Sequence, residues 1–142
     1  MSVTQSNPSP ERSPYDILGG DAALRRLVER FYVLMDETPE FYGIRKLHPE
    51  SLAGSTDKLY WFLSGWMGGP ALYVERVGAP MLRARHLPFA IGKAERDLWL
   101  ACMRRALDDC HAGAPEFRAW LMQQFFATAD WMRNKPGDMP GS

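Results

Sequence analysis

The 142-residue sequence has no excess of charge of either sign, because 17 basic residues balance 17 acidic ones. A basic surplus is typical of proteins that bind nucleic acid or anionic membranes, so we expect neither partner. No apolar run approaches the roughly 20 residues that cross a bilayer. Residues 1–13 are rich in Ser and Pro and lack the apolar stretch of a secretory signal, which predicts a disordered tail.

Cysteine and histidine are also scarce. The only cysteines, Cys102 and Cys110, lie eight residues apart, and in one helix their Cα atoms would be about 12 Å apart, too far for a disulfide. We therefore expect two free thiols, as in a reducing cytoplasm. Three separate histidines do not predict a closed zinc site. The sequence contains no phosphate loop, CxxC pair, HExxH motif or nucleophile elbow; a Ser-His-Asp arrangement stays open, although no motif points to it.

Apolar residues recur at intervals of three and four, which is the period of an amphipathic helix. The pattern predicts four long helices, at 22–37, 55–67, 93–112 and from 115 to the 130s, and one short helix at 80–86. Asp21 is placed to cap the first, and the second ends at the run Gly68-Gly69-Pro70. No alternating strand pattern is present. The sequence thus predicts one all-α domain, because a split would leave pieces too small to bury a core.

Several short motifs occur in an order that resembles the truncated haemoglobins, specifically group II, over roughly residues 14 to 133. The shared features are Gly19-Gly20, Phe31-Tyr32, Leu52-Ala53-Gly54, Phe62-Leu63, Gly68-Gly69-Pro70, Tyr73, Leu82-Arg83, Arg85-His86, Pro88-Phe89-Ala90-Ile91, Glu95-Arg96-Asp97 and Trp99. The spacing of thirteen from His86 to Trp99 is that of the group, and this tryptophan separates it from group I. The resemblance implies a two-over-two helical sandwich around a haem, spanning residues 14–133, with a disordered tail at 134–142.

Two positions depart from the family pattern. Trp66-Met67 stands where the family commonly has a Tyr-Trp pair, which affects packing. His48 stands before Pro49 where the family often has Tyr or Phe, and this difference affects ligand chemistry.

His86 is the residue that the resemblance makes the iron ligand. From the residues alone it is a histidine at the end of a short helix, beside Arg85 and the helix stop at Pro88, and a partly exposed helix-end histidine is the simpler interpretation. A five-coordinate haem needs one neutral imidazole nitrogen, with the other nitrogen hydrogen-bonded to fix the ring. His111, near another helix end, is expected to be a capping or surface residue.

The resemblance also implies which residues surround the haem. Lys58, Tyr73 and Arg85 are the candidates near the anionic propionates, and solvated surface charge is the alternative. Apolar burial against the ring is expected from Leu59, Phe62, Leu63, Leu82, Phe89, Ile91 and Met103, some of which serve as ordinary core.

The resemblance places Tyr32, His48 and Trp99 above the iron, with Leu59 beside them and the small Ser55 at a side entrance. Bound dioxygen carries partial negative charge, so each donor aimed at it contributes on the order of 1–3 kcal/mol. Since 1.4 kcal/mol corresponds to about tenfold, two such bonds would slow oxygen escape by roughly a hundredfold. The alternative for Tyr32 and Trp99 is plain core filling.

The expected activity is therefore reversible binding of dioxygen, and of carbon monoxide and nitric oxide, at haem b. The alternative is an enzyme, a nitric oxide dioxygenase or weak peroxidase, that takes electrons from an external reductase, since the sequence has no flavin or nicotinamide motif. A haem-free helical interaction module is a third hypothesis. We expect a cytoplasmic monomer or weak homodimer.

Overall fold

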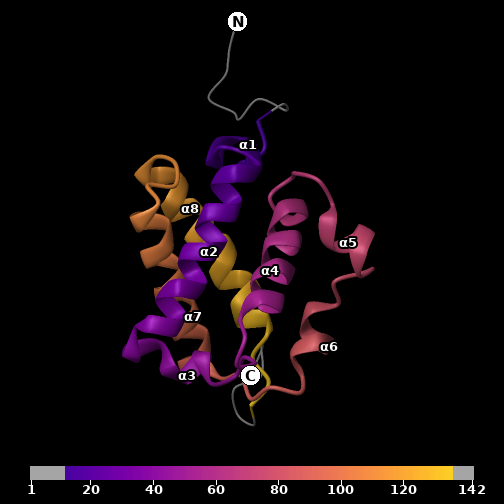
Figure 1. Ribbon diagram of the computed structural model, residues 1–142, viewed down its shortest axis with the longest axis vertical. Coiled ribbons are helices and arrows are strands. Elements are labelled where there is room, and N and C mark those ends of the chain that lie inside the picture. The colour runs from indigo at the N-terminus through magenta and orange to yellow at the C-terminus, as the bar shows by residue number, and fades with distance from the viewer. Residues whose placement is uncertain (1–11, 136–142) are drawn as a thin grey trace, which may run out of the picture.

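The computed structural model describes residues 12–135, and within this range every regular element is a helix. The elements are α1 (Pro14–Leu18), α2 (Asp21–Glu37), a 3-10 turn η1 (Pro39–Phe41), α3 (Tyr42–Arg45), α4 (Ala53–Trp66), α5 (Leu72–Arg76), α6 (Leu82–His86), α7 (Lys93–Asp109) and α8 (Pro115–Trp131) (Figure 1). The all-α prediction is confirmed, and the four long helices are α2, α4, α7 and α8. Residues 1–11 and 136–142, which hold most of both expected tails, lie outside the described range.

The first turn of the fold is fixed against the end of α4. Ser13 caps α1 through a reciprocal pair of bonds with Asp16, and the Tyr15 N–H donates to the Met67 carbonyl at 2.9 Å. The Tyr15 ring lies so close to Gly69 that a Cβ there would be 2.5 Å from its Cδ1. This close approach is why a glycine follows α4.

The expectation that Asp21 caps α2 is wrong. Gly20 occupies the cap position without a side-chain bond, and Asp21 is the first helical residue. Its carboxylate instead accepts a hydrogen bond from the Tyr60 hydroxyl of α4. The acidic side chain therefore links two helices rather than satisfying the backbone of one.

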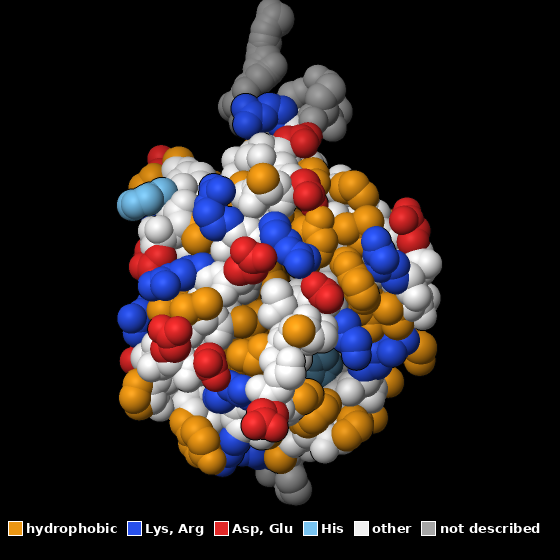
Figure 2. Space-filling view, in the orientation of Figure 1, with side chains coloured by type: hydrophobic (Ala, Val, Ile, Leu, Met, Phe, Trp, Pro, Cys, Tyr) orange, Lys and Arg blue, Asp and Glu red, His pale blue; other side chains and the backbone are white. Residues whose placement is uncertain are grey.

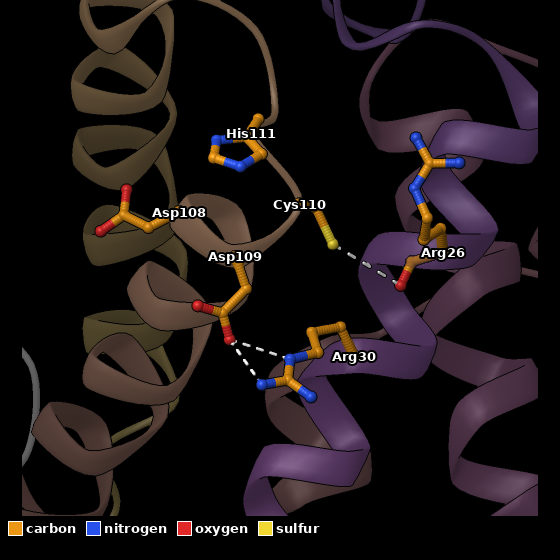
Figure 3. A pocket seen from close by; sticks show the side chains of 6 residues that line it. All are labelled: Arg26, Arg30, Asp108, Asp109, Cys110 and His111. Carbon is orange, nitrogen blue, oxygen red and sulfur yellow. Dashed lines mark hydrogen bonds and ion pairs between the residues drawn. The ribbon is translucent and has the colours of Figure 1, made fainter.

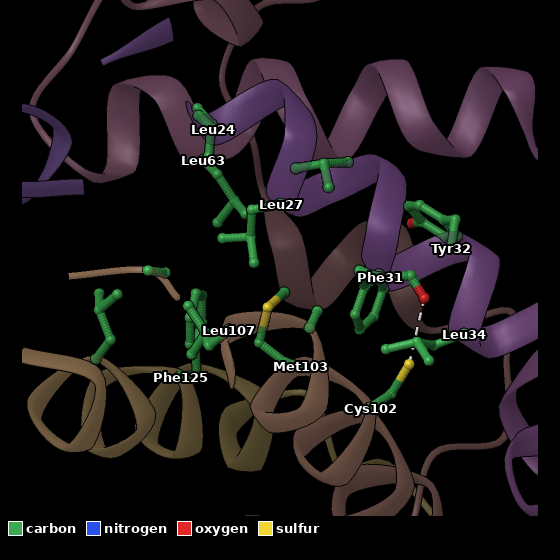
Figure 4. Close-up of a cluster of buried hydrophobic side chains, with 14 of the residues drawn as sticks. Leu24, Leu27, Phe31, Tyr32, Leu34, Leu63, Cys102, Met103, Leu107 and Phe125 are labelled. Carbon is green, nitrogen blue, oxygen red and sulfur yellow. Dashed lines mark hydrogen bonds between the residues drawn. The ribbon is translucent and has the colours of Figure 1, made fainter. Parts of the chain in front are cut away.

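The core lies where α2 packs on α7, with α4 on the other side of α2 and α8 against α7. Figure 4 shows α2 side chains facing residues of α7 and α8. The fully buried members include Leu24, Leu27, Phe31, Met103 and Leu107. At the edge of this cluster the Cys102 thiol donates to the Phe31 carbonyl at 3.3 Å. The pairs α2/α4 and α7/α8 form the two layers of the sandwich.

The helix α6 is held differently, because none of its five residues is buried. Arg85 donates to the carbonyls of Ala79 and Pro80 just before the helix, while Arg83 donates to the carbonyls of Trp131 and Arg133 at the end of α8. Polar bonds to backbone oxygens, rather than apolar packing, thus set the position of α6. The residues described have no helix long and apolar enough to span a bilayer.

Candidate functional site

His86, the last residue of α6, has its ring fixed by its own helix. Its Nδ1 lies 2.7 Å from the Leu82 carbonyl oxygen. Because a carbonyl only accepts hydrogen bonds, Nδ1 carries the proton, and in the neutral ring Nε2 keeps its lone pair. This is the tautomer of an imidazole that binds a metal through Nε2.

A single imidazole does not hold a bare ion. Among residues 12–135 no cluster of three or more His, Cys, Asp or Glu side chains is arranged as a metal site. Any metal bound at His86 must therefore bring most of its ligands with it, as the iron of a porphyrin does. The donor set fits a haem and does not fit zinc.

The surface beside α6 has the shape and chemistry that a flat apolar group requires. Figure 2 shows a hollow between α4 and α6, with a histidine side chain inside it and cationic side chains at its margin. Large apolar side chains of the α5–α6 region are exposed, namely Val74, Val77, Met81, Leu87 and Phe89. Exposed apolar side chains gathered in this way mark a binding surface.

Tyr32 on α2 offers a hydroxyl that no described residue uses. The side chain is only 7% exposed, yet within residues 12–135 its hydroxyl makes no hydrogen bond. Every fully enclosed side-chain oxygen or nitrogen among the described residues has a hydrogen-bond partner. Because the Tyr32 hydroxyl has none, its oxygen must border accessible space. Burial, with a smaller effect from nearby Cys102, raises the pKa of Tyr32 far above its ordinary value. Tyr32 is thus a neutral donor at physiological pH.

His48, just after α3, meets Tyr32 edge-on with ring centroids 5.7 Å apart. Its Nδ1 lies 2.8 Å from the Ile44 carbonyl oxygen, so Nδ1 is the donor and the neutral ring presents Nε2 as an acceptor. Burial lowers the pKa of His48, and Arg45 and His86 lower it further, against the opposing effect of the Ile44 bond. Whereas the resemblance implied a donor to the bound ligand, this tautomer favours accepting a proton or ordering a water.

Trp99 on α7 completes the three residues expected around the ligand. Its indole ring packs 5.2 Å from Phe31, which in turn meets Tyr32 at 5.0 Å. On its other side Trp99 meets Phe125 of α8 at 5.5 Å. Its N–H makes no hydrogen bond within the part of the chain described here. Phe31 thus packs against both aromatic side chains that carry an unused donor.

The remaining expected site residues divide by burial. Leu63 and Met103 are wholly buried, Leu59, Phe62, Leu82 and Ile91 are half-buried, and Phe89 is 41% exposed. Ser55 is half-buried in the first turn of α4. Arg85 lies 5.7 Å over the ring of Tyr73, which itself meets Phe62 at 6.3 Å. Lys58 is exposed and makes no ion pair with any described residue.

Two groups that shape the site could not be identified from the sequence. The Ile44 carbonyl selects the His48 tautomer, and no side-chain pattern reveals a backbone acceptor. Asn134 was assigned to the tail, yet its amide donates to the His86 carbonyl at 3.2 Å and accepts from the Ile91 N–H at 3.0 Å. The helical domain therefore makes contacts beyond residue 133. An Asn shortly after a long helix is a weak signal of such a bond.

A second hollow lies between α2 and the end of α7, away from all these residues (Figure 3). It is lined by Arg26, Arg30, Asp108, Asp109, Cys110 and His111. Arg30 and Asp109 pair across it at 2.8 Å, so charge within it is already partly neutralised. It shares no residue with the site around His86.

An all-helical sandwich of two pairs of packed helices is the architecture of the two-on-two globins. A family model described as bacterial-like globin matches residues 13–134. The chain belongs to this family, as a group II truncated haemoglobin. Membership implies a haem, which the donor set of the site fits.

The similarity between this chain and its relatives extends over nearly the whole chain. A group 2 truncated haemoglobin of Bacillus subtilis is 39% identical over 124 residues, which are 87% of this chain and 89% of that protein. The group II 2-on-2 haemoglobin of Agrobacterium tumefaciens has 43% identity and a TM-score of 0.84, covering 91% of this chain and 99% of that one. A solved structure of a B. subtilis truncated haemoglobin, described as oxygen-avid, has 37% identity and a TM-score of 0.78, covering 87% and 100%.

Proposed function

We propose that the protein is a haem b protein that binds dioxygen, and other diatomic ligands, reversibly and releases dioxygen slowly. The observation that carries this proposal is the pair of unused donors, Tyr32 and Trp99, both packed on Phe31, together with a His86 ring whose Nε2 keeps its lone pair. The description of the B. subtilis relative as oxygen-avid supports the slow release.

Haem would supply a ferrous iron able to bind a diatomic molecule. His86 would hold the iron through Nε2, and its bond to the Leu82 carbonyl keeps the ring from rotating. Phe89, 6.4 Å from the His86 ring, and the half-buried Leu82 would cover the ring on the same side. Arg85 and Tyr73 lie together where anionic propionates would meet a cation and a hydroxyl, and exposed Lys58 is the further candidate.

Tyr32 and Trp99 would act on the bound ligand as donors. Both are neutral and already oriented by Phe31, so little rotamer entropy is lost when they form a bond. His48, as an acceptor, would orient a water or the Tyr32 hydroxyl rather than the ligand itself. Ser55 and Leu59 would flank the entrance from α4.

The test of the iron ligand is a comparison of His86→Ala with His111→Ala. His111 is exposed at the far end of α7 and makes no contact with the proposed site. After haem reconstitution, wild type and His111→Ala should give the Soret band of a histidine-bound haem, and His86→Ala should lose it or show a shifted band restored by added imidazole. Normal spectra for His86→Ala would refute the assignment.

The enzymatic alternative shares this site and differs in turnover. His48 favours it, because a neutral acceptor beside the ligand is able to take up a proton during peroxide chemistry. Sustained consumption of peroxide or nitric oxide with an external reductase, lost in His48→Leu, would establish it. A single turnover without cycling would leave ligand binding as the function. The free thiols Cys102 and Cys110 favour a reducing compartment such as the cytoplasm.

A further inference from the structure

The segment between α6 and α7 is bridged by one side chain from beyond the end of α8. The Asn134 amide nitrogen donates to the His86 carbonyl at 3.2 Å, and its amide oxygen accepts from the Ile91 N–H at 3.0 Å. The Asn134 backbone N–H also donates to the Ile91 carbonyl at 2.7 Å. One residue therefore fixes both ends of the segment 86–91.

The bond to His86 falls on a helix that is held by polar bonds rather than by apolar packing. No side chain of α6 is buried, and its last carbonyls have no partner further along the helix. The His86 carbonyl accepts from the Phe89 N–H at 3.0 Å and from Asn134. Because α6 is short and packs poorly, the position of the His86 backbone relative to the core depends on such bonds.

Ion pairs hold the end of α8 against α7, so the backbone around Asn134 is held in place. Asp130 binds Arg96 of α7 at 2.7 Å and Arg133 at 2.6 Å. Lys135 pairs with Glu95 at 2.8 Å, and Glu95 accepts from the Gly92 N–H at the start of α7. These bonds hold residue 134 against the first turn of α7.

We propose that Asn134 is a positioning residue for His86: its amide sets the place of the ligating histidine by bridging the His86 carbonyl and the Ile91 N–H. The proposal rests on the proposed function, in which His86 binds iron. Loss of the bridge would let α6 shift relative to the core, and the iron–histidine bond would then be longer and more variable. Haem would also leave faster, since that bond contributes to its retention.

The experiment compares three variants of the full-length haem protein. Asn134→Asp keeps the acceptor for Ile91 and replaces the donor to His86 with a second oxygen, while Asn134→Ala removes both. Lys93→Met is the charge-matched control, because it also lowers the net charge by one, and Lys93 lies exposed at the start of α7 without an ion pair to any described residue. The readouts are the iron–histidine stretching band of the ferrous protein and the rate of haem transfer to excess apomyoglobin.

We expect the stretching band to move to lower frequency and broaden in Asn134→Asp and Asn134→Ala, with haem transfer about five-fold faster, equivalent to about 1 kcal/mol. Lys93→Met should keep the wild-type band and rate. The proposal is overturned if all three variants behave alike, or if neither Asn134 variant differs from wild type. A wild-type protein with no iron–histidine band would refute the proposed function itself, and this inference with it.

Discussion

Changing Tyr32 to Phe separates the two uses of a buried tyrosine, because it removes only the hydroxyl. A tyrosine that merely fills a core donates its hydroxyl to the protein, so its loss destabilises the fold. The Tyr32 hydroxyl has no partner in residues 12–135, although the side chain is 7% exposed. Tyr32→Phe should therefore affect ligand binding and leave the fold intact.

The expected magnitudes follow from this lone hydroxyl. No protein bond is lost, and one poorly solvated polar group is removed, so the free energy of unfolding of the haem-free protein should stay the same or rise by up to about 1 kcal/mol. A donor bond to the ligand contributes on the order of 1–3 kcal/mol, so oxygen dissociation should become roughly ten- to a hundredfold faster.

The assays are chemical denaturation of the haem-free protein and stopped-flow displacement of oxygen by carbon monoxide. Tyr60→Phe is the matched control, because its hydroxyl donates to Asp21 far from His86, and this bond raises the pKa of Tyr60 to about 12. It should lose about 1 kcal/mol of stability and keep the wild-type oxygen rate. If Tyr32→Phe loses stability and leaves oxygen dissociation unchanged, Tyr32 is core and the distal assignment is wrong.

Three further predictions concern residues of the helical fold outside the proposed site. His111 ends α7 with φ +50°, so His111→Gly should raise the unfolding free energy by about 0.5–1 kcal/mol in thermal melts. The hydrogen bond from Arg96 lowers the pKa of Asp130, and this effect outweighs that of burial, which raises it. The ionised Asp130 therefore stabilises the fold at any pH above its pKa in the unfolded chain, and this stabilisation is lost as the pH falls through its lower pKa in the folded protein. Asp130→Asn should thus cost about 1 kcal/mol at pH 7, and its denaturation curves should converge with those of wild type as the pH falls through the lowered folded pKa of Asp130. Cys102, whose pKa burial raises to about 12, should react with thiol reagents far more slowly than the other cysteine, and equal rates would contradict this.

The helices were predictable because their signals are local. The stripe Leu24, Leu27, Val28, Phe31, Leu34 and Met35 is buried along α2 as its spacing requires, and glycine followed by proline ends α4 where expected. Asp21 failed as a cap because Tyr60, from another helix, competes for its carboxylate. A local rule has no information about a partner 39 residues away.

The site was predictable in its residue types and not in its protonation. Tyr32, His48 and Trp99 stand out only through the resemblance, since aromatic residues on a helix face usually fill a core. The Nδ1 proton of His48 depends on the Ile44 carbonyl, and that of His86 on the Leu82 carbonyl. Backbone acceptors have no sequence signature, so the chemistry of both rings required the fold.

The weak packing of α6 also makes it a part of the fold that opens easily. The core shared by α2, α7 and α8 buries its side chains completely, whereas α6 buries none and depends on arginine and asparagine bonds to backbone oxygens. Segments held in this way open at a lower free energy than the core that carries them. We therefore expect the α6 corner to open while the helical core stays closed, so that backbone amides of α6 should exchange with solvent faster than those of α2 and α7.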